Sequence, residues 1–190
     1  MLVLSSPSGA GKSSVAKKLI NEIDDLNMSI SVTTRLKRKN EIDGKDYFFV
    51  SEKEFFQKQK LGYFLETANV FNNFYGTPKD YVEKSILNGK DLIFDIDWQG
   101  ANQLFESSRN NMVSIFILPP SIEELEKRLS LRNLDTSNQV KIRMSKAKQE
   151  ISHYNEYDYV IINSDLIKTV SLVKSILESE RLKQNRLLGL

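Results

Sequence analysis

The chain has 190 residues, of which 40% are hydrophobic and 27% charged, and its formal net charge is +2. These values are typical of a globular protein with its own core, and they argue against nucleic acid or a membrane surface as a partner. With no Cys and one His, the chain excludes disulfides and thiolate or multi-histidine metal sites.

The same composition bears on location and metal. A chain without Cys fits a reducing compartment, and we expect a cytoplasmic protein. The apolar start, residues 1–4, is too short for a signal peptide, and no apolar run is long enough to span a membrane. A bound metal would be a hard cation held by oxygens, with Mg²⁺ the first candidate.

Apolar runs alternate with amphipathic segments along the chain, which predicts an α/β protein with a parallel sheet. We predict buried strands at Leu2–Ser5, 92–97, Val113–Leu118 and 159–163. We predict helices over 12–24, 77–89, from Ser121 (with Glu124 in a capping box), over 138–154 and from Leu166. The last helix has a predicted buried face of Ile167, Val170, Val173, Ile176 and Leu177.

The segment from about residue 30 to 76 breaks this alternation. A short helix over 51–60 begins with a capping box of Ser51 and Glu54, and Asn72–Asn73 is a candidate hairpin turn. We interpret the segment as a small mixed or antiparallel β subdomain inserted in the parallel core. Its predicted strands are 30–34, 47–50, 64–70 and 74–75.

The most informative stretch is the glycine loop 6–13, between the first strand and the first helix, which reads Ser-Pro-Ser-Gly-Ala-Gly-Lys-Ser. It matches the phosphate-loop pattern G-x-x-x-x-G-K-[ST] except at Ser6, which replaces the first glycine. Gly9 and Gly11 can adopt the positive φ that aims backbone N–H groups at phosphate oxygens. Lys12 would reach the β- and γ-phosphates and the Ser13 hydroxyl would bind Mg²⁺. An ordinary glycine turn is the disfavoured alternative.

Two carboxylates close a later apolar run. Asp95 and Asp97 lie where a parallel strand is predicted to end, at the edge of the sheet that binds ligands. Taken alone the pair could be a solvated strand end, but beside a phosphate loop we expect Asp95 to join the Mg²⁺ shell, through water.

Seven further blocks, in order along nearly the whole chain, resemble those of guanylate kinases. They are 31–38, 44–50, 64–66, 74–77, 95–100, 116–121 and 157–163. The resemblance implies a P-loop-type parallel sheet core flanked by helices, with an inserted mixed β GMP-binding subdomain and a small helical lid. It places the core at about 1–29, 78–124 and 146–190, the insertion at about 30–77 and the lid at about 125–145.

The resemblance also implies an activity, the Mg²⁺-dependent transfer of the ATP γ-phosphoryl group to GMP in purine nucleotide metabolism. Arg35 and Arg38 resemble the pair that holds the GMP phosphate, assisted by Tyr47 and Tyr75, and guanidinium forks suit a dianion. Glu66 resembles the residue that reads guanine, because one carboxylate matches the ring N–H and the exocyclic amine together. Ser31, Gly76, Thr77 and Asp97 resemble the rest of that pocket.

For ATP, the resemblance implies contacts from the phosphate loop and from Asn163, near the adenine. The loop residues are Ser8, Gly9, Ala10, Gly11, Lys12, Ser13 and Ser14. Arg128, Arg132 and Arg143 match the lid and transfer arginines, which act in catalysis with Lys12 and Arg35. The chain departs from the family's Gly-Arg-Gly at 131–133, where it has Leu-Arg-Asn, and this predicts altered closing kinetics without loss of activity.

Two alternatives compete with this reading. One is another nucleoside-monophosphate kinase, acting on AMP, UMP or dTMP, against which the β-rich insertion and Glu66 argue. The other is a non-catalytic scaffold domain of the same fold, which is disfavoured because the phosphate loop and its arginines are present. The sequence leaves open whether dGMP is also accepted and whether the chain is a monomer or a homodimer.

Overall fold

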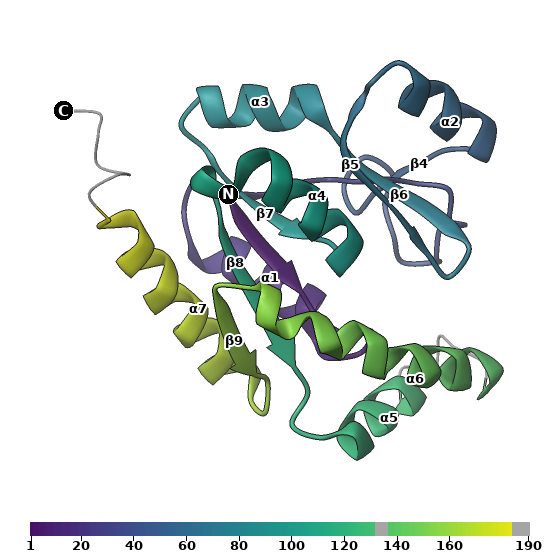
Figure 1. Cartoon of the computed structure of the whole chain (residues 1–190), viewed down its shortest axis with the longest axis vertical. Coiled ribbons are helices and arrows are strands. Elements are labelled where there is room, and N and C mark those ends of the chain that lie inside the picture. The colour runs from purple at the N-terminus through teal and green to yellow at the C-terminus, as the bar shows by residue number, and fades with distance from the viewer. Residues whose placement is uncertain (132–136, 184–190) are drawn as a thin grey trace.

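A five-stranded parallel sheet forms the centre of the computed structural model, which describes residues 1–131 and 137–183 (Figure 1). The strand order is β2-β7-β1-β8-β9, and each neighbouring pair runs parallel. The predicted parallel α/β core is therefore confirmed. The strands are β1 (Leu2–Ser5), β2 (Leu26–Met28), β7 (Asp91–Asp95), β8 (Val113–Leu118) and β9 (Tyr159–Ile162).

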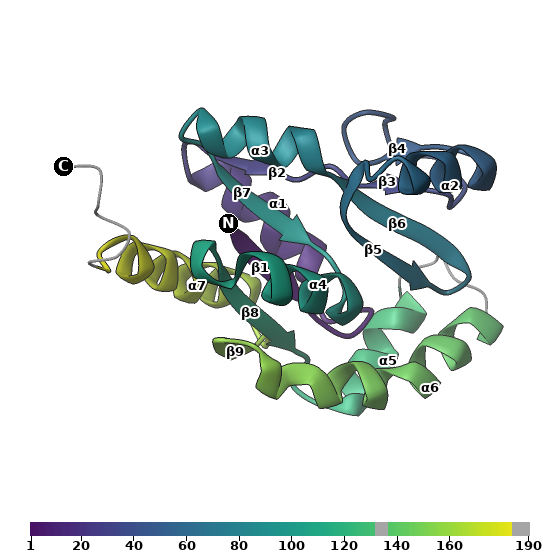
Figure 2. The ribbon, with the colours of Figure 1, turned by 45° about the horizontal axis from the view of Figure 1, so that its top comes forward.

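Helices cover both faces of this sheet (Figures 1 and 2). Because side chains alternate along a strand, Leu2 and Leu4 of β1 enter one core while Val3 enters the other. Helices α1 and α7 supply the first core, and α3 and α4 the second. Their bounds are α1 (Lys12–Glu22), α3 (Lys79–Leu87), α4 (Trp98–Ser108) and α7 (Leu166–Arg181).

A second sheet lies beside the carboxyl ends of the central strands, with the order β4-β3-β6-β5 (Figure 2). β3 pairs parallel with β4, whereas β6 pairs antiparallel with both β3 and β5, so the insertion is mixed, as expected. Its elements are β3 (Val32–Thr33), β4 (Phe48–Phe49), α2 (Glu52–Lys60), β5 (Phe64–Val70) and β6 (Asn73–Pro78).

The second sheet has its own aromatic core. Phe55 of α2 is fully buried and stacks on Phe64, with ring centroids 4.6 Å apart, and it also contacts Phe74. The predicted capping box of Ser51 and Glu54 is present at the start of α2. This cap and this small core stabilise the insertion from within, and Leu65 of β5 also packs against the core of the central sheet.

The hairpin between β5 and β6 turns one residue earlier than predicted. Val70 pairs with Asn73, so the two turn residues are Phe71 and Asn72, with φ of 49° and 61°. Two consecutive positive φ values are the signature of a type I′ turn, which matches the twist of the flanking strands. Asn72–Asn73 was predicted because Asn and Gly are preferred at such turns. The pairing of β5 with β6 instead puts Phe71 and Asn72 in the turn.

The third part of the fold is a pair of helices, α5 (Ile122–Leu131) and α6 (Ser137–Ser152). Leu125, Leu129 and Ala147 form a small core between them. Ser121 accepts a hydrogen bond from the Glu124 N–H, but the Glu124 carboxylate bonds Arg128, so only half of the predicted capping box is present. The short 3₁₀ turns are Arg109–Asn111 and His153–Glu156.

Some expectations differ from the fold. Strand β2 and helix α4 were not predicted, and β7 ends at Asp95, which leaves Ile96 and Asp97 beyond the strand. Ile167 is 70% exposed, because at 100° per residue it lies about 120° from Val173 around α7, outside the buried stripe. Of the departure at 131–133, residues 132 and 133 lie outside the described residues. The domain boundaries stay a prediction. No helix within 1–131 or 137–183 has the length and apolar content to cross a membrane.

Candidate active site

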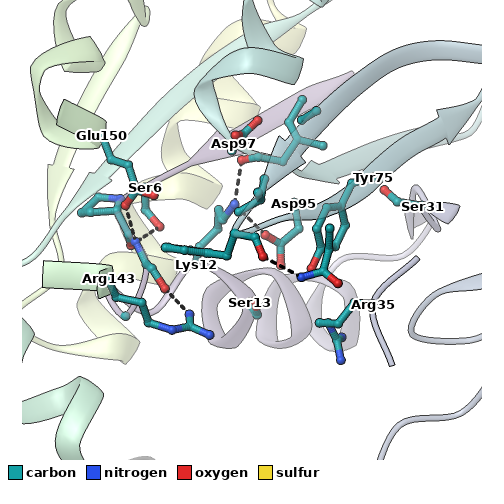
Figure 3. Close-up of a pocket in the computed structure, with 18 of the residues that line it drawn as sticks. Ser6, Lys12, Ser13, Ser31, Arg35, Tyr75, Asp95, Asp97, Arg143 and Glu150 are labelled. Atoms are coloured by element: carbon teal, nitrogen blue, oxygen red, sulfur yellow. Dashed lines mark hydrogen bonds and ion pairs between the residues drawn. The ribbon is translucent and has the colours of Figure 1, made fainter. Parts of the chain in front are cut away.

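A cavity of about 220 Å³ opens where the central sheet, the second sheet and α6 meet (Figure 3). It lies at the carboxyl ends of β1 and β7, the edge at which open parallel sheets bind ligands. Fourteen of the residues predicted from the sequence line it together: Ser8, Gly9, Gly11, Lys12, Ser13, Ser31, Arg35, Arg38, Tyr47, Glu66, Tyr75, Asp95, Asp97 and Arg143.

The phosphate loop forms one wall of the cavity. Gly9 and Gly11 have φ of 96° and 101°, as predicted, and Gly11 is the N-cap of α1. A side chain at Gly9 would meet Leu129 at 2.8 Å, so neighbours as well as the backbone require glycine there. Ser6 is not among the residues with positive φ, which explains why serine is tolerated at the first glycine position of the motif.

The Lys12 side chain is held by the last residue of β7, Asp95, and by Ile96, which follows it. Its Nζ lies 2.9 Å from Asp95 Oδ1 and donates to the Ile96 carbonyl at 2.6 Å. Both side chains of the ion pair are mostly buried, at 16% exposure each. The pair therefore fixes the ammonium at the mouth of the loop, where it can meet an incoming phosphate.

The donors available for a metal are oxygens. Ser13 and Asp95 both line the cavity beside the phosphate loop, and hydroxyl and carboxylate oxygens are the ligands that Mg²⁺ prefers. Lys12 engages one Asp95 oxygen, Oδ1, so the residues fit a cation that takes its other ligands from phosphates and water.

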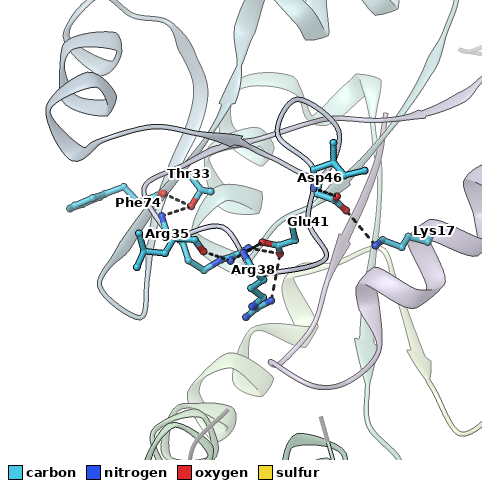
Figure 4. Close-up of polar contacts among 9 residues, drawn as sticks. Lys17, Thr33, Arg35, Arg38, Glu41, Asp46 and Phe74 are labelled. Carbon is cyan, nitrogen blue, oxygen red and sulfur yellow. Dashed lines mark hydrogen bonds and ion pairs between the residues drawn. The ribbon is translucent and has the colours of Figure 1, made fainter. Parts of the chain in front are cut away.

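Arg35 is fixed by a carboxylate that the sequence reading did not single out. Glu41 accepts two hydrogen bonds from the Arg35 guanidinium, at 3.0 and 2.7 Å, and a third from the Arg38 N–H at 2.8 Å (Figure 4). Burial favours the neutral acid, but the bonds from Arg35 and Arg38 outweigh it and hold the pKa of Glu41 below its usual value. A bidentate pair of this kind sets the plane of the guanidinium before any ligand arrives.

Aromatic rings complete this end of the cavity. The Arg35 guanidinium carbon lies 5.4 Å from the centroid of Tyr47 and 5.7 Å from that of Phe49. Tyr47 and Tyr75 meet edge to face, with centroids 5.9 Å apart. Burial, and then the nearby Asp95 carboxylate, raise the pKa of Tyr47, so its hydroxyl stays a hydrogen-bond donor.

Glu66 lies on β5 of the second sheet and lines the same cavity. It is 3% exposed and accepts a hydrogen bond from the Thr77 hydroxyl at 2.6 Å. Burial raises the pKa of Glu66 to about 7, the Thr77 bond opposes that rise, and Asp97 adds to it. Gly100 packs directly against the Glu66 carboxylate, and a methyl group at Gly100 would overlap it.

Helix α6 closes the remaining side with residues far along the chain. The Arg143 guanidinium donates to the Ser8 hydroxyl, while Glu150 accepts the Ser8 N–H at 3.0 Å (Figure 3). The ring of Phe71, at the hairpin tip, lies 5.1 Å from the Arg143 guanidinium carbon and 5.0 Å from Lys146 Nζ. Through α6 the structure joins the phosphate loop to the second sheet.

Several predicted site residues do not line this cavity. Ala10 is buried, and its carbonyl accepts from Asn163 Nδ2 at 2.8 Å and from Arg128 at 3.5 Å, behind the loop. Asn163 is itself only 6% exposed. Ser14, Gly76 and Thr77 also lie outside the lining, Thr77 acting through Glu66. Arg132 lies outside the described residues.

Comparisons with known proteins agree with this geometry. The family model for guanylate kinase matches residues 1–180. The chain is 52% identical over its whole length to a guanylate kinase of Rhodospirillum rubrum, covering 87% of that protein, and 49% identical to one of Paramagnetospirillum magneticum, covering 89%. The chain belongs to the guanylate kinase family. The crystal structure of guanylate kinase from Anaplasma phagocytophilum aligns with a TM-score of 0.84 at 42% identity, covering all of this chain and 89% of that one.

Membership of the guanylate kinase family confirms the resemblance, the fold class and the assignment to nucleotide kinases. Glu41, Glu150 and Phe71 are among the residues in or beside the site that the sequence did not predict. Glu41 follows the basic run at 35–39, and Glu150 is the only acid in a helix whose other charges are Lys and Arg. In both cases the change from basic to acidic residues could have been detected in the sequence. Phe71 had no comparable signal, because only the hairpin register puts it at the tip.

Proposed function

We propose that the chain transfers the γ-phosphoryl group of ATP to GMP, giving ADP and GDP. The observation that carries the proposal is a single cavity with a phosphate loop at one end and a buried carboxylate, Glu66, at the other. Arg35 and Arg38 line the same cavity. Such a cavity suits two nucleotides that meet through their phosphates.

Each end has matching chemistry. The loop amides and Lys12 would hold the β- and γ-phosphates of ATP, and Arg35, Arg38, Tyr47 and Tyr75 would hold the GMP phosphate. Glu66, when ionised, would accept the guanine ring N–H and its exocyclic amine together, a pairing that adenine cannot offer. Ser31 and Asp97 line the same region, which supports roles for them in that pocket.

Catalysis follows from positioning and charge. A GMP phosphate oxygen attacks the γ-phosphorus, the bond from that phosphorus to the bridging oxygen breaks, and ADP leaves with the electron pair. We assign Lys12, Arg35 and Arg143 to neutralise the charge that spreads over the transferred group. Ser13 and, through water, Asp95 would hold Mg²⁺, which would supply positive charge to offset that of the ATP phosphates. Roles for Arg128, Arg132 and Asn163 stay predictions, as does the cytoplasmic location.

A coupled assay of ADP formation tests the proposal. The protein is given ATP and Mg²⁺ with GMP, dGMP, AMP, UMP or dTMP in turn, beside the variant Glu66→Gln. We expect turnover with GMP to exceed that with AMP by about 10⁴ or more, and the variant to lose most of that preference. Glu126→Gln, an exposed acid on α5, is the matched control and should behave as wild type.

Two results would overturn the proposal. Equal turnover with AMP, UMP or dTMP would favour another nucleoside-monophosphate kinase. A folded protein that binds nucleotides but turns over none of them would favour the scaffold domain.

A further inference from the structure

The phosphate loop presents its amides to an acid of the same chain. The Ser8 N–H faces the cavity and donates to Glu150 Oε2 at 3.0 Å. Amides of such a loop serve to bind phosphate oxygens, so a side-chain carboxylate on one of them takes the position of an anionic ligand. The mechanism above gives Glu150 no task.

The carboxylate is held there by its helix. Arg143 and Glu150 are seven residues apart on α6, which places them two turns apart on one face of the helix. Both contact Ser8, Arg143 through the hydroxyl and Glu150 through the N–H. The helix therefore contacts the loop at Ser8 through one cation and one anion. An incoming phosphate would attract Arg143 and repel Glu150.

The surroundings do not favour a negative charge at this position. Burial raises the pKa of Glu150, and Asp97 adds to the rise, while the Ser8 N–H, Lys12 and Arg143 oppose it. An incoming phosphate brings further negative charge into the same space. Repulsion between the two anions and competition for one N–H both act against keeping the carboxylate in place.

We propose that Glu150 is a positioning residue that occupies a phosphate position on the loop and is displaced from the Ser8 N–H when ATP binds. The inference rests on the proposed function. Occupancy by Glu150 lowers the affinity for ATP, because each binding event must first break its hydrogen bond to the loop. Displacement also releases one of the two contacts that dock α6 on Ser8 and leaves Arg143 beside the arriving phosphate.

The variant Glu150→Gln tests this, because a neutral amide of the same size repels phosphate less and is a weaker acceptor. We expect KM for ATP to fall about three- to tenfold, the range for weakening one competing hydrogen bond to a charged group. KM for GMP and kcat should stay within about twofold of wild type, since Glu150 has already left the loop when the transfer takes place. Calorimetry with ADP alone should show a matching decrease in Kd.

Glu178→Gln is the matched control, since Glu178 is an exposed acid on α7 and the charge change is identical. It should leave KM for ATP and Kd for ADP unchanged. An unchanged or higher Kd for ADP in Glu150→Gln, with a thermal melting temperature like that of wild type, overturns the proposal. So does a loss of kcat at unchanged KM, which would mean that Glu150 acts in the transfer itself.

The two proposals fail in different ways. If wild type does not phosphorylate GMP, the proposed function fails, yet the ADP calorimetry still decides the role of Glu150. If wild type is active and Glu150→Gln binds ADP no more tightly, only the role of Glu150 fails.

Discussion

At the scale of single residues, the site depends on a few side chains whose positions are fixed by others. Glu41 orients Arg35, Asp95 holds Lys12, and Thr77 and Gly100 confine Glu66. All of these supporting contacts are made within the chain itself. The substrate therefore meets a largely preorganised set of charges, which reduces the cost of ordering them on binding.

Gly100 should be needed for the guanine end rather than for the fold. Alanine in a helix normally stabilises by about 0.5–1 kcal/mol relative to glycine, but here its methyl group would overlap the Glu66 carboxylate. We expect Gly100→Ala to raise KM for GMP about tenfold or more while KM for ATP changes by less than about twofold. Steady-state kinetics with each substrate varied in turn measures both values.

Gly62→Ala is the control for that substitution, because open space surrounds Gly62 while its φ is 67°. It should cost about 1 kcal/mol of stability from backbone strain and leave both KM values unchanged. If KM for GMP rises equally in the two variants, the contact between Gly100 and Glu66 has no part in binding.

The pH profile should report the ionisation of Glu66. Burial raises its pKa to about 7, so below pH 7 a proton increasingly occupies the carboxylate that guanine needs. The sign follows directly: kcat/KM for GMP should fall as pH decreases, by about tenfold per unit well below the pKa. Glu66→Gln removes this group, so its profile should retain only the ionisation of the substrates. A wild-type profile parallel to that of Glu66→Gln would contradict the assignment.

At the scale of elements, the sequence patterns predicted the core well. β1 and β8 have the predicted bounds, because continuous apolar runs between turn residues leave little choice. β2 was missed because it has three residues, of which only Leu26 is buried. α4 was missed because Asp97, its N-cap, was included in the predicted strand 92–97 and Gly100 lies in its first turn.

The site was predictable to the extent that its chemistry is local. The phosphate loop and Lys12 were predicted from one short motif. A role for Glu66 was predicted only from the resemblance of several sequence blocks to guanylate kinases. The contacts of Glu150 and Phe71 could not be predicted, because α6 meets the loop and the hairpin across more than seventy residues of chain. Non-local contacts of this kind have no periodic signal in the sequence.

The hairpin tip provides a prediction at this scale. Phe71 has a positive φ, which costs a residue with a Cβ roughly 1 kcal/mol, yet its ring faces Arg143 and Lys146 on α6. Phe71→Gly relieves the backbone and removes the ring. We expect a melting temperature equal to or above that of wild type, with kcat reduced about three- to tenfold because Arg143 loses a neighbour that orients it.

Asn72→Gly is the matched control, since Asn72 has φ of 61° and the substitution relieves the same kind of strain. It should raise stability without lowering kcat. If Phe71→Gly keeps full kcat, the contact between the hairpin and α6 is only structural.

At the scale of the whole molecule, the chain has three parts: the parallel core, the inserted mixed sheet and the α5–α6 pair (Figures 1 and 2). Residues of the core, of the insertion and of α6 line one cavity. Each contributes charges of its own, Lys12 and Asp95 from the core, Arg35 and Glu66 from the insertion, and Arg143 and Glu150 from α6. Because no single part holds a complete site, catalysis should depend on their relative positions, and water should be excluded only when both nucleotides are bound.

The most direct measurement follows the fate of a γ-labelled phosphoryl group of ATP in the presence of GMP and Mg²⁺, for wild type and Glu66→Gln. We predict that wild type places the label in the β-phosphate of GDP, with little released as inorganic phosphate, and that the variant transfers much less at the same GMP concentration. Label that stays in ATP, or appears as inorganic phosphate at the same rate with and without GMP, would contradict phosphoryl transfer to GMP as the activity of this chain.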